Sequence, residues 1–162
     1  MEKTNASRIL ERQGVNFDLI EYTVDPENLD AHHVAFSLGQ DISTVFKTLV
    51  LHGDKNGYFV CVIQGDKEVD LKKAAKASGN KKAALIPMKD LLPLTGYIRG
   101  GCTAIGMKKN FPVFLDENAL LQDLIHISAG RRGLQIKLDP QDYVKVTNAT
   151  ICDLISSEDE PA

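Results

Sequence analysis

The sequence predicts one domain of the α+β class. The chain has 162 residues, close to the usual size of a single domain, and its 43 % hydrophobic and 25 % charged residues are typical of globular proteins. Strand-like runs alternate with short, scattered helical segments, without the regular order of a parallel sheet with crossover helices. The sequence contains no internal repeat and no low-complexity linker, so we expect residues 1–162 to form a single domain.

Two short helices and one strand are predicted near the N-terminus. Thr4 can cap a helix that runs to about Gly14, and residues 17–22 are typical of a strand. Asp30 can cap a second helix. Gly39 is expected to end it, because glycine readily adopts the left-handed conformation of a helix C-terminus.

The centre of the predicted core is a β-hairpin. Two apolar runs, residues 45–53 and 57–65, are separated by three polar residues, which is a hairpin signal. Asp70 then predicts the start of a short basic helix over residues 71–79.

The second half of the chain is expected to hold more strands than helices. Pro87 is expected to open a short helix that Pro93 limits. Residues 96–106 contain four glycines and predict a strand, a tight loop and a return. Further strands are expected over 111–116, 124–128, 134–139 and 149–155, with a turn at 130–133 and a helix near 140–146.

The net charge of −3 by itself argues against a constitutive nucleic-acid binder. The charges are not evenly distributed, however. Residues 1–65 hold 5 basic and 9 acidic side chains, residues 66–109 hold 10 and 4, and residues 110–162 hold 4 and 9. A basic middle segment, net +6, therefore lies between two acidic ends.

The cysteines and the apolar runs indicate the compartment. Cys61, Cys102 and Cys152 are odd in number and lack paired spacing, so we expect a reduced, cytoplasmic protein rather than a disulfide framework. The polar N-terminus has no signal-peptide core, and no apolar run approaches the roughly 18 residues of a membrane span. The histidines and cysteines match no zinc-binding motif, so we expect no metal and no cofactor.

Lys47 is the first candidate for a functional residue. It stands in an otherwise apolar strand, and alternation puts it on the face of Val45, Leu49 and Leu51. One interpretation is an edge-strand lysine whose ammonium group reaches solvent. The other is a cation at the mouth of a pocket, where it would meet a carboxylate, a phosphate or a polarised carbonyl.

The glycine loop at residues 100–106 and Ser128 are further candidates. Main-chain N–H groups of a glycine-rich loop can bind an anion or an ester oxyanion, although the same pattern also fits a bulged hairpin. Ser128 could face the same cleft or could bond to its own turn. Cys102 is disfavoured as a nucleophile, because no activating base stands beside it in the sequence.

Four segments resemble, in order and spacing, the YbaK family of aminoacyl-tRNA deacylases. They are FKTLVL (46–51), DLKKAAKASG (70–79), GYIRGGCTAIGMKKNFPVFLD (96–116) and ISAGRRG (127–133). The resemblance extends from about Ile9 to Leu154 and is strongest to the bacterial Cys-tRNA(Pro) deacylase branch. It implies a mixed, six-stranded, barrel-like sheet surrounded by short helices, the fold shared with the editing domain of prolyl-tRNA synthetases. It also implies metal-free hydrolysis of mischarged tRNA.

The resemblance also implies a set of site residues. Lys47 corresponds to the family lysine that positions the substrate, and main-chain donors near Gly101 would hold the ester carbonyl. Residues expected to line or border the substrate pocket are Tyr22, Thr48, Gly100, Thr103, Gly106, Ser128 and Gly130. The chain departs from the family pattern where Thr103 and Ala104 replace a Ser-Pro pair and where Gln135 replaces an aspartate, which affects pocket shape and selectivity.

The expected activity is the editing of Cys-tRNA(Pro), and of Cys-tRNA(Cys) as a further substrate. A site selects poorly between amino acids of similar size, so a separate hydrolytic site is useful. The substrate's own thiol or the ribose hydroxyl could assist the reaction, which would explain why no catalytic triad is present. Two alternatives stay open: a deacylase for another amino acid, such as Ala-tRNA(Pro), and a non-catalytic module that binds tRNA or a synthetase.

The expected partner is aminoacyl-tRNA(Pro), and a complex with prolyl-tRNA synthetase stays open. The basic middle segment could form a rim that contacts phosphates if its side chains share one face. These side chains are Lys72, Lys73, Lys76, Lys81, Lys82, Arg99, Lys108 and Lys109. Such a rim predicts an affinity for tRNA that falls steeply with salt.

Overall fold

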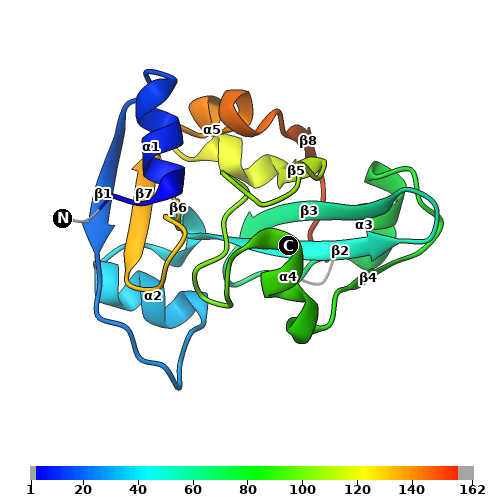
Figure 1. Cartoon of the computed structure of the whole chain (residues 1–162), viewed down its shortest axis with the longest axis horizontal. Coiled ribbons are helices and arrows are strands. Elements are labelled where there is room, and N and C mark those ends of the chain that lie inside the picture. The colour runs from blue at the N-terminus through cyan, green and yellow to red at the C-terminus, as the bar shows by residue number, and fades with distance from the viewer. Residues whose placement is uncertain (1–2, 157–162) are drawn as a thin grey trace.

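The computed structural model describes residues 3–156 and folds them into two β-sheets with short helices around them (Figure 1). The strands are β1 (Phe17–Glu21), β2 (Phe46–Gly53), β3 (Gly57–Gln64), β4 (Ala83–Leu85), β5 (Val113–Asp116), β6 (Ile125–Ser128), β7 (Leu134–Leu138) and β8 (Thr150–Cys152). One sheet has the order β1-β7-β6 and the other β4-β2-β3-β5-β8. The α+β class is therefore confirmed. The expected single six-stranded sheet is replaced by eight strands in two sheets within the described residues.

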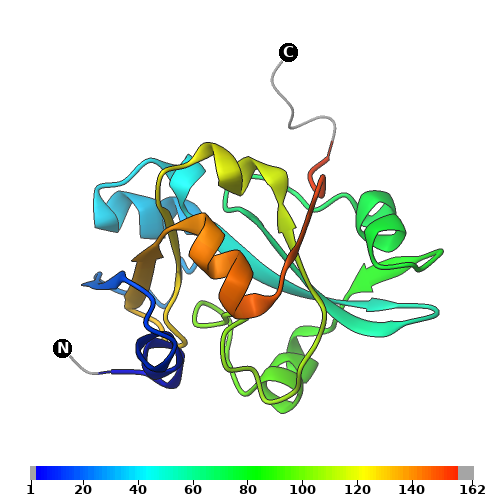
Figure 2. The ribbon, with the colours of Figure 1, turned by 90° about the horizontal axis from the view of Figure 1, so that it is seen from above.

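The predicted hairpin is confirmed as the centre of the fold. β2 pairs with β3 in antiparallel register: Phe46 lies opposite Gln64 at one end, and Gly53 lies opposite Gly57 at the turn. The hairpin runs across the molecule from the three-stranded sheet to a projecting turn at the opposite end (Figure 2). β3 pairs in parallel with β5, and β5 in parallel with β8, so the five-stranded sheet is mixed.

The helices are α1 (Asn5–Arg12), α2 (Ala31–Leu38), α3 (Leu71–Ala77), α4 (Leu91–Thr95) and α5 (Pro140–Thr147), with 3-10 turns η1 (Ile42–Thr44), η2 (Met88–Asp90) and η3 (Glu117–Leu121). Four of the five helices in the described residues begin where the sequence predicts, whereas Pro87 opens a 3-10 turn and α4 begins only at Leu91. The side chains of Thr4, Asp30 and Asp70 each accept a main-chain N–H in the first turn of α1, α2 and α3. Gly39 ends α2 in the left-handed conformation.

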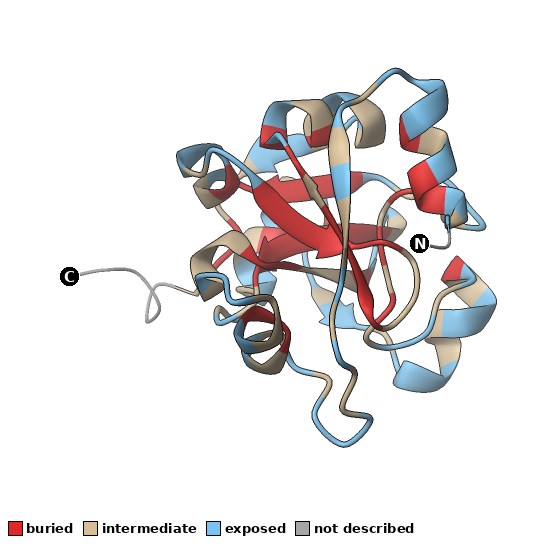
Figure 3. Ribbon diagram, turned by 90° about the vertical axis from the view of Figure 1, so that its left-hand side faces the viewer, coloured by how far each residue is buried: buried red, intermediate tan, exposed pale blue. Residues whose placement is uncertain are grey.

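The largest apolar cluster joins residues of both sheets, and the buried parts of the strands gather in the middle of the molecule (Figure 3). β2 and β3 contribute Phe46, Val50, Val60 and Val62, and β6 and β7 contribute Ile125, Ile127, Leu134 and Ile136. Tyr143 of α5 and Leu10 of α1 join this cluster. Burial of each large apolar side chain stabilises the fold by about 1.5–3 kcal/mol.

A second apolar cluster covers the opposite face of the five-stranded sheet. Leu51, Phe59 and Ile63 pack there against Ala74 of α3. Leu49 packs against the same cluster, whereas Phe46 and Val50 belong to the first cluster. The alternation expected along β2 is therefore confirmed on both faces of the sheet.

The segment that follows α4 differs from the sequence prediction. Residues 96–106 form a loop, so the expectation of a strand and a return is wrong. The loop is held by its own contacts: the hydroxyl group of Tyr97 donates to the main-chain oxygen of Ile105 at 2.6 Å. α4 also continues through Pro93 to Thr95, because a proline in the first turn lacks only an N–H that has no intrahelical acceptor.

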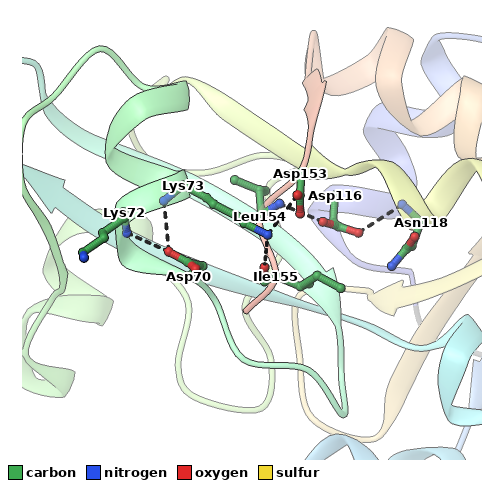
Figure 4. Close-up of polar contacts among 8 residues, drawn as sticks. All are labelled: Asp70, Lys72, Lys73, Asp116, Asn118, Asp153, Leu154 and Ile155. Carbon is green, nitrogen blue, oxygen red and sulfur yellow. Dashed lines mark hydrogen bonds and ion pairs between the residues drawn. The ribbon is translucent and has the colours of Figure 1, made fainter. Parts of the chain in front are cut away.

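The C-terminal segment is fixed to the second cluster by a buried carboxylate (Figure 4). The carboxylate of Asp116 is fully buried and accepts the main-chain N–H groups of Leu154 at 2.9 Å and Asn118 at 3.0 Å. Nζ of Lys73 donates to the main-chain oxygen of Ile155 at 2.8 Å and pairs with Asp153 at 2.9 Å. One lysine of the expected basic rim is thus used to hold the C-terminal segment.

Candidate functional site

A pocket of about 520 Å³ opens at the outer edge of β2, a size within the roughly 300–1,000 Å³ of small-molecule sites. α2 and the loop before it form one wall, and the segment from β4 to α4 forms another. Its lining residues are Leu29, Asp30, Ala31, Val34, residues 45–50, Gly65, Leu85, Ile86, Met88, Leu91, Arg99, Gly100, Cys102, Ser128 and Gln135. The pocket therefore combines an apolar wall with a few polar groups.

The pocket exists because the two sheets separate along β2. β4 pairs with β2 only over Leu51–Gly53. At the other end, Val45, the residue before β2, forms an isolated bridge with His126 of β6. The edge of β2 between these points is not covered by a strand in residues 3–156, and the pocket occupies that gap.

Lys47 lies on the pocket wall, half-buried. Its Nζ donates to the main-chain oxygen of Gly65 at 3.2 Å. Gly65 lies so close to α2 that a Cβ would overlap the Cβ of Ala31. The close packing of α2 against Gly65 therefore fixes the carbonyl group that orients the ammonium group of Lys47.

Asp30 is the acidic side chain among the lining residues. Its Oδ1 accepts the main-chain N–H of His33 at 2.9 Å as the cap of α2. The same position that ends a loop and starts a helix thus places a carboxylate in the pocket that holds Lys47.

Ser128 and Gln135 form a polar wall on the three-stranded sheet, where they are cross-strand partners on β6 and β7. Oγ of Ser128 accepts the main-chain N–H of Gly130 at 3.1 Å. The side chain thus lines the pocket and also bonds to its own turn. Gln135 is only 5 % exposed, and its Oε1 has no hydrogen-bond partner among the described residues.

The glycine loop contributes Gly100 and Cys102 to the pocket rather than Gly101. Gly100 has a left-handed φ of 84°. The N–H of Gly101 donates to the main-chain oxygen of Ile98 at 2.9 Å. A Cβ on Gly101 would lie 2.9 Å from Cα of Arg131, so this glycine permits close contact between two loops.

Four other expected residues lie away from the pocket wall. Tyr22 packs against the small cluster of α2, and Thr103 is buried with its Oγ1 near the N–H of Ile105 at 3.4 Å. A Cβ on Gly130 would contact Tyr97 at 3.1 Å. Gly106 lines a separate cavity of about 230 Å³ beside α1 and α5. Of the expected site residues, the structure gathers Lys47, Thr48, Gly100 and Ser128 around the pocket.

Burial keeps the thiol of Cys102 protonated. It raises the pKa of Cys102 to about 12, against a smaller opposing effect of a hydrogen bond with Thr95. No histidine is among the residues that line the pocket. A thiol needs an activating neighbour to act as a thiolate at neutral pH, so the geometry does not support Cys102 as the nucleophile.

Sequence reasoning did not single out the apolar wall of the pocket. Leu29, Ile86, Met88 and Leu91 come from segments that are distant along the chain and meet only in the fold. No local pattern distinguishes them from ordinary core residues. The sequence predicts Asp30 only as a helix cap, because its place in the pocket that Lys47 also lines depends on tertiary packing.

Residues 3–156 hold neither a metal-binding cluster of side chains nor a membrane-spanning helix. Histidine, cysteine, aspartate and glutamate side chains do not gather there in a group of three or more that could hold a metal ion. In the same range, no helix has both the length and the apolar character needed to cross a membrane.

Comparisons with known proteins agree with this fold. A model of the aminoacyl-tRNA editing domain matches residues 25–146. The chain is 47 % identical over 157 residues to a proposed Cys-tRNA(Pro)/Cys-tRNA(Cys) deacylase, EbsC, of Enterococcus faecalis, covering 97 % of this chain and 96 % of that protein.

Solved structures share the fold at lower identity. One, described as a proposed trans-editing enzyme for prolyl-tRNA synthetase, superposes with a TM-score of 0.82 at 23 % identity and covers 96 % of this chain and all of the other. The hypothetical protein APE2540 has a TM-score of 0.86 at 22 % identity and covers 94 % of this chain and 100 % of that one. The matched domain and the identity to the Enterococcus protein establish that this chain belongs to the YbaK family of aminoacyl-tRNA editing proteins.

Proposed function

We propose that this chain hydrolyses the aminoacyl ester of mischarged tRNA, with Cys-tRNA(Pro) as its main substrate and Cys-tRNA(Cys) as a second. The observation that carries the proposal is the pocket at the edge of β2, which joins Lys47 to a polar wall. Membership of the editing family and 47 % identity to a relative named for this activity support it.

The reaction adds water to the ester and releases the free amino acid and tRNA. A nucleophile bonds to the carbonyl carbon, the ester C–O bond breaks, and the ribose oxygen leaves with a proton. The nucleophile is water itself or the cysteinyl thiol, whose thioester or thiolactone water then opens. Because the substrate can supply the attacking group, a pocket that holds and polarises the ester is sufficient.

In this proposal, Lys47 positions the substrate through its ammonium group. The amine already donates to Gly65 at 3.2 Å, and an ammonium group has three donors, so it can also bond to an oxygen of the ester or of the terminal ribose. Gly100 lets the loop main chain approach the ligand because a left-handed φ of 84° favours glycine. Ser128 offers a hydroxyl group on the wall that the three-stranded sheet forms.

We also propose that the RNA partner is tRNA(Pro), in the cytoplasm, with prolyl-tRNA synthetase as the enzyme whose errors are corrected. Arg99 is the basic residue of the middle segment that lines the pocket. A guanidinium group binds phosphate well, which favours contact with the backbone of the tRNA 3′ end.

A panel of aminoacyl-tRNAs tests the proposal. The purified protein is incubated with Cys-tRNA(Pro), Ala-tRNA(Pro), Ser-tRNA(Pro), Pro-tRNA(Pro) and Cys-tRNA(Cys), and release of the amino acid is followed. We expect fast hydrolysis of the cysteinyl esters and slow hydrolysis of the others. Preference for Ala-tRNA(Pro) would assign a different substrate, and tRNA binding without turnover of any ester would favour a non-catalytic module.

A further inference from the structure

The edge of β2 that faces the pocket exposes main-chain hydrogen-bonding groups to it. β4 covers this edge only from Leu51 onward, and β6 meets it only at Val45. Residues 46–50 between these points line the pocket. A ligand in the pocket therefore lies where the next strand of the sheet would otherwise lie.

The strand register identifies which main-chain groups face the pocket. The N–H of Ile86 donates to the oxygen of Val50 at 3.1 Å, on the outer edge of β2. The N–H of Gly65 donates to the oxygen of Val45 at 2.8 Å, on the side of β3. Successive residues of a strand direct their N–H and C=O groups to opposite edges. Thr48, two residues before Val50, therefore directs both its N–H and its C=O outward into the pocket.

These two groups need polar partners. Thr48 is half-buried, and buried main-chain donors and acceptors are almost always hydrogen-bonded in proteins. Within residues 3–156, no strand pairs with this edge of β2 at Thr48, and the main-chain hydrogen bonds of the turns and loops do not include either group. The geometry thus presents one donor and one acceptor, spaced as in a β-ladder.

We propose that Thr48 binds the aminoacyl group as one residue of an antiparallel strand binds another; this rests on the proposed function. The substrate's α-ammonium donates to the C=O of Thr48, and its ester carbonyl oxygen accepts the N–H of Thr48. An aminoacyl group has the N–Cα–C=O spacing of a peptide residue, which in extended form directs both groups to one side.

This pairing places a donor where negative charge develops. When the nucleophile adds to the carbonyl carbon, the π electrons of the C=O bond move to the oxygen, which the N–H of Thr48 then stabilises. The oxygen returns the electrons when the bond to the ribose oxygen breaks. A positioned main-chain donor of this kind accelerates acyl transfer about 10²–10³-fold.

The pairing also orients the side chain of the substrate. Residues directly opposite in an antiparallel pair project their side chains on the same face. An L-cysteinyl side chain therefore lies beside the side chain of Thr48, on the face of Phe46 and Val50, whereas a D-residue would project toward the face of Lys47. We expect hydrolysis to favour the L-ester.

The sharpest test removes the main-chain N–H of Thr48 and keeps its side chain. Thr48 is replaced by its α-hydroxy acid, which keeps the side chain and converts the amide to a main-chain ester. We expect kcat on Cys-tRNA(Pro) to fall about 10²–10³-fold. We also expect weaker binding of 3′-cysteinylamido-3′-deoxyadenosine, an inert amide analogue of the substrate. The ester weakens the Lys47 carbonyl that pairs with β3, so the thermal midpoint is measured as well.

A matched control is the α-hydroxy acid of alanine at Ala83. Ala83 lies on β4 opposite Gly53. His52, like Val50, directs its main-chain groups toward β4, so its partner Ala84 directs its own toward β2. Ala83 is the next residue, and its N–H therefore points away from β2. The control also loses an edge N–H, but away from the residues that line the pocket. Its kcat should match that of the unmodified protein.

The outcomes separate the inference from the proposed function. Unchanged kcat and analogue affinity for the Thr48 ester, with an active unmodified protein, would overturn the inference alone. If the protein with this ester does not fold, the pairing is tested with an altered substrate and the unmodified protein. 3-Mercaptopropionyl-tRNA(Pro) lacks the α-ammonium and should be hydrolysed at least about tenfold more slowly, and an equal rate would overturn the pairing. No hydrolysis of any cysteinyl ester by the unmodified protein would overturn both proposals.

Discussion

Few of the side chains that line the pocket are charged or nucleophilic. Lys47 supplies an oriented ammonium group, and Asp30 is engaged as the cap of α2. The main chain of Thr48 adds a donor and an acceptor that no side-chain pattern reveals. Because a cysteinyl ester brings a thiol and a neighbouring ribose hydroxyl, the protein mainly has to hold the ester and stabilise charge.

Replacing Cys102 tests whether the enzyme supplies a thiol nucleophile. Burial raises the pKa of Cys102 to about 12, so the thiol stays protonated at neutral pH. We expect kcat of Cys102→Ala on Cys-tRNA(Pro) to stay within about threefold, since a protonated thiol is a poor nucleophile. A complete loss of turnover in a folded variant would restore the enzyme thiol as the attacking group.

His126 predicts a pH dependence of stability beside the pocket. Its side chain is 1 % exposed, and Oγ1 of Thr44 lies 3.1 Å from its Nδ1. Burial lowers the pKa of His126 below 6.5, aided by the charge of Lys137. The unfolded chain therefore binds the proton more tightly, and stability is lost as pH falls below about 6.5 through the folded pKa.

The measurement is urea unfolding between pH 7.5 and 5. We expect the protein to lose more free energy of unfolding over this range than His126→Asn, which cannot titrate. Parallel pH profiles of the two proteins would contradict the assignment.

At the scale of elements, the short-range signals were the reliable ones. The caps at Thr4, Asp30 and Asp70 and the hairpin turn were predicted because each depends on neighbouring residues. The sequence predicts a strand, a tight loop and a return over residues 96–106, because four glycines in eleven residues are typical of a tight turn. In the fold, contacts between distant segments shape this segment, such as Gly101 against Arg131.

Gly101→Ala tests the role of that contact. A Cβ would lie 2.9 Å from Cα of Arg131 and 3.1 Å from the main-chain nitrogen of Arg132, and main-chain atoms cannot move aside easily. We expect a loss of about 1–3 kcal/mol in the free energy of unfolding, typical of overpacking. Cys102→Ala, one residue away, is the control. Unchanged stability would show that the loops do not depend on this close contact.

At the scale of the whole molecule, the site is a consequence of topology. The gap between β4 and β6 exposes the edge of β2, and α2, α4 and the glycine loop surround it. Of the residues that the resemblance implies for the site, Lys47, Thr48, Gly100 and Ser128 line this pocket, and their part in binding or catalysis stays a prediction. The resemblance did not predict the uncovered edge of β2, because the pairing of strands that are distant along the chain does not follow from local sequence.

The charge pattern makes a prediction at the same scale. The net charge is −3, but Arg99 lies on the pocket wall, where the phosphates of a bound tRNA 3′ end would approach. We expect tRNA affinity to fall steeply with salt, and Arg99→Ala to reduce the slope by about one. Lys145→Ala, an exposed position on α5, is the control. An affinity indifferent to salt would exclude a phosphate-contacting surface.

The central claim is that the cysteinyl ester is hydrolysed in the pocket at the edge of β2. The most direct measurement is the single-turnover rate of Cys-tRNA(Pro) hydrolysis for the unmodified protein, Lys47→Ala and Lys55→Ala, an exposed lysine in the hairpin turn. We expect Lys47→Ala to lose roughly 10- to 100-fold, the effect of one charge-assisted hydrogen bond of about 1.5–3 kcal/mol, and Lys55→Ala to be unaffected. Equal rates for all three proteins would contradict the account.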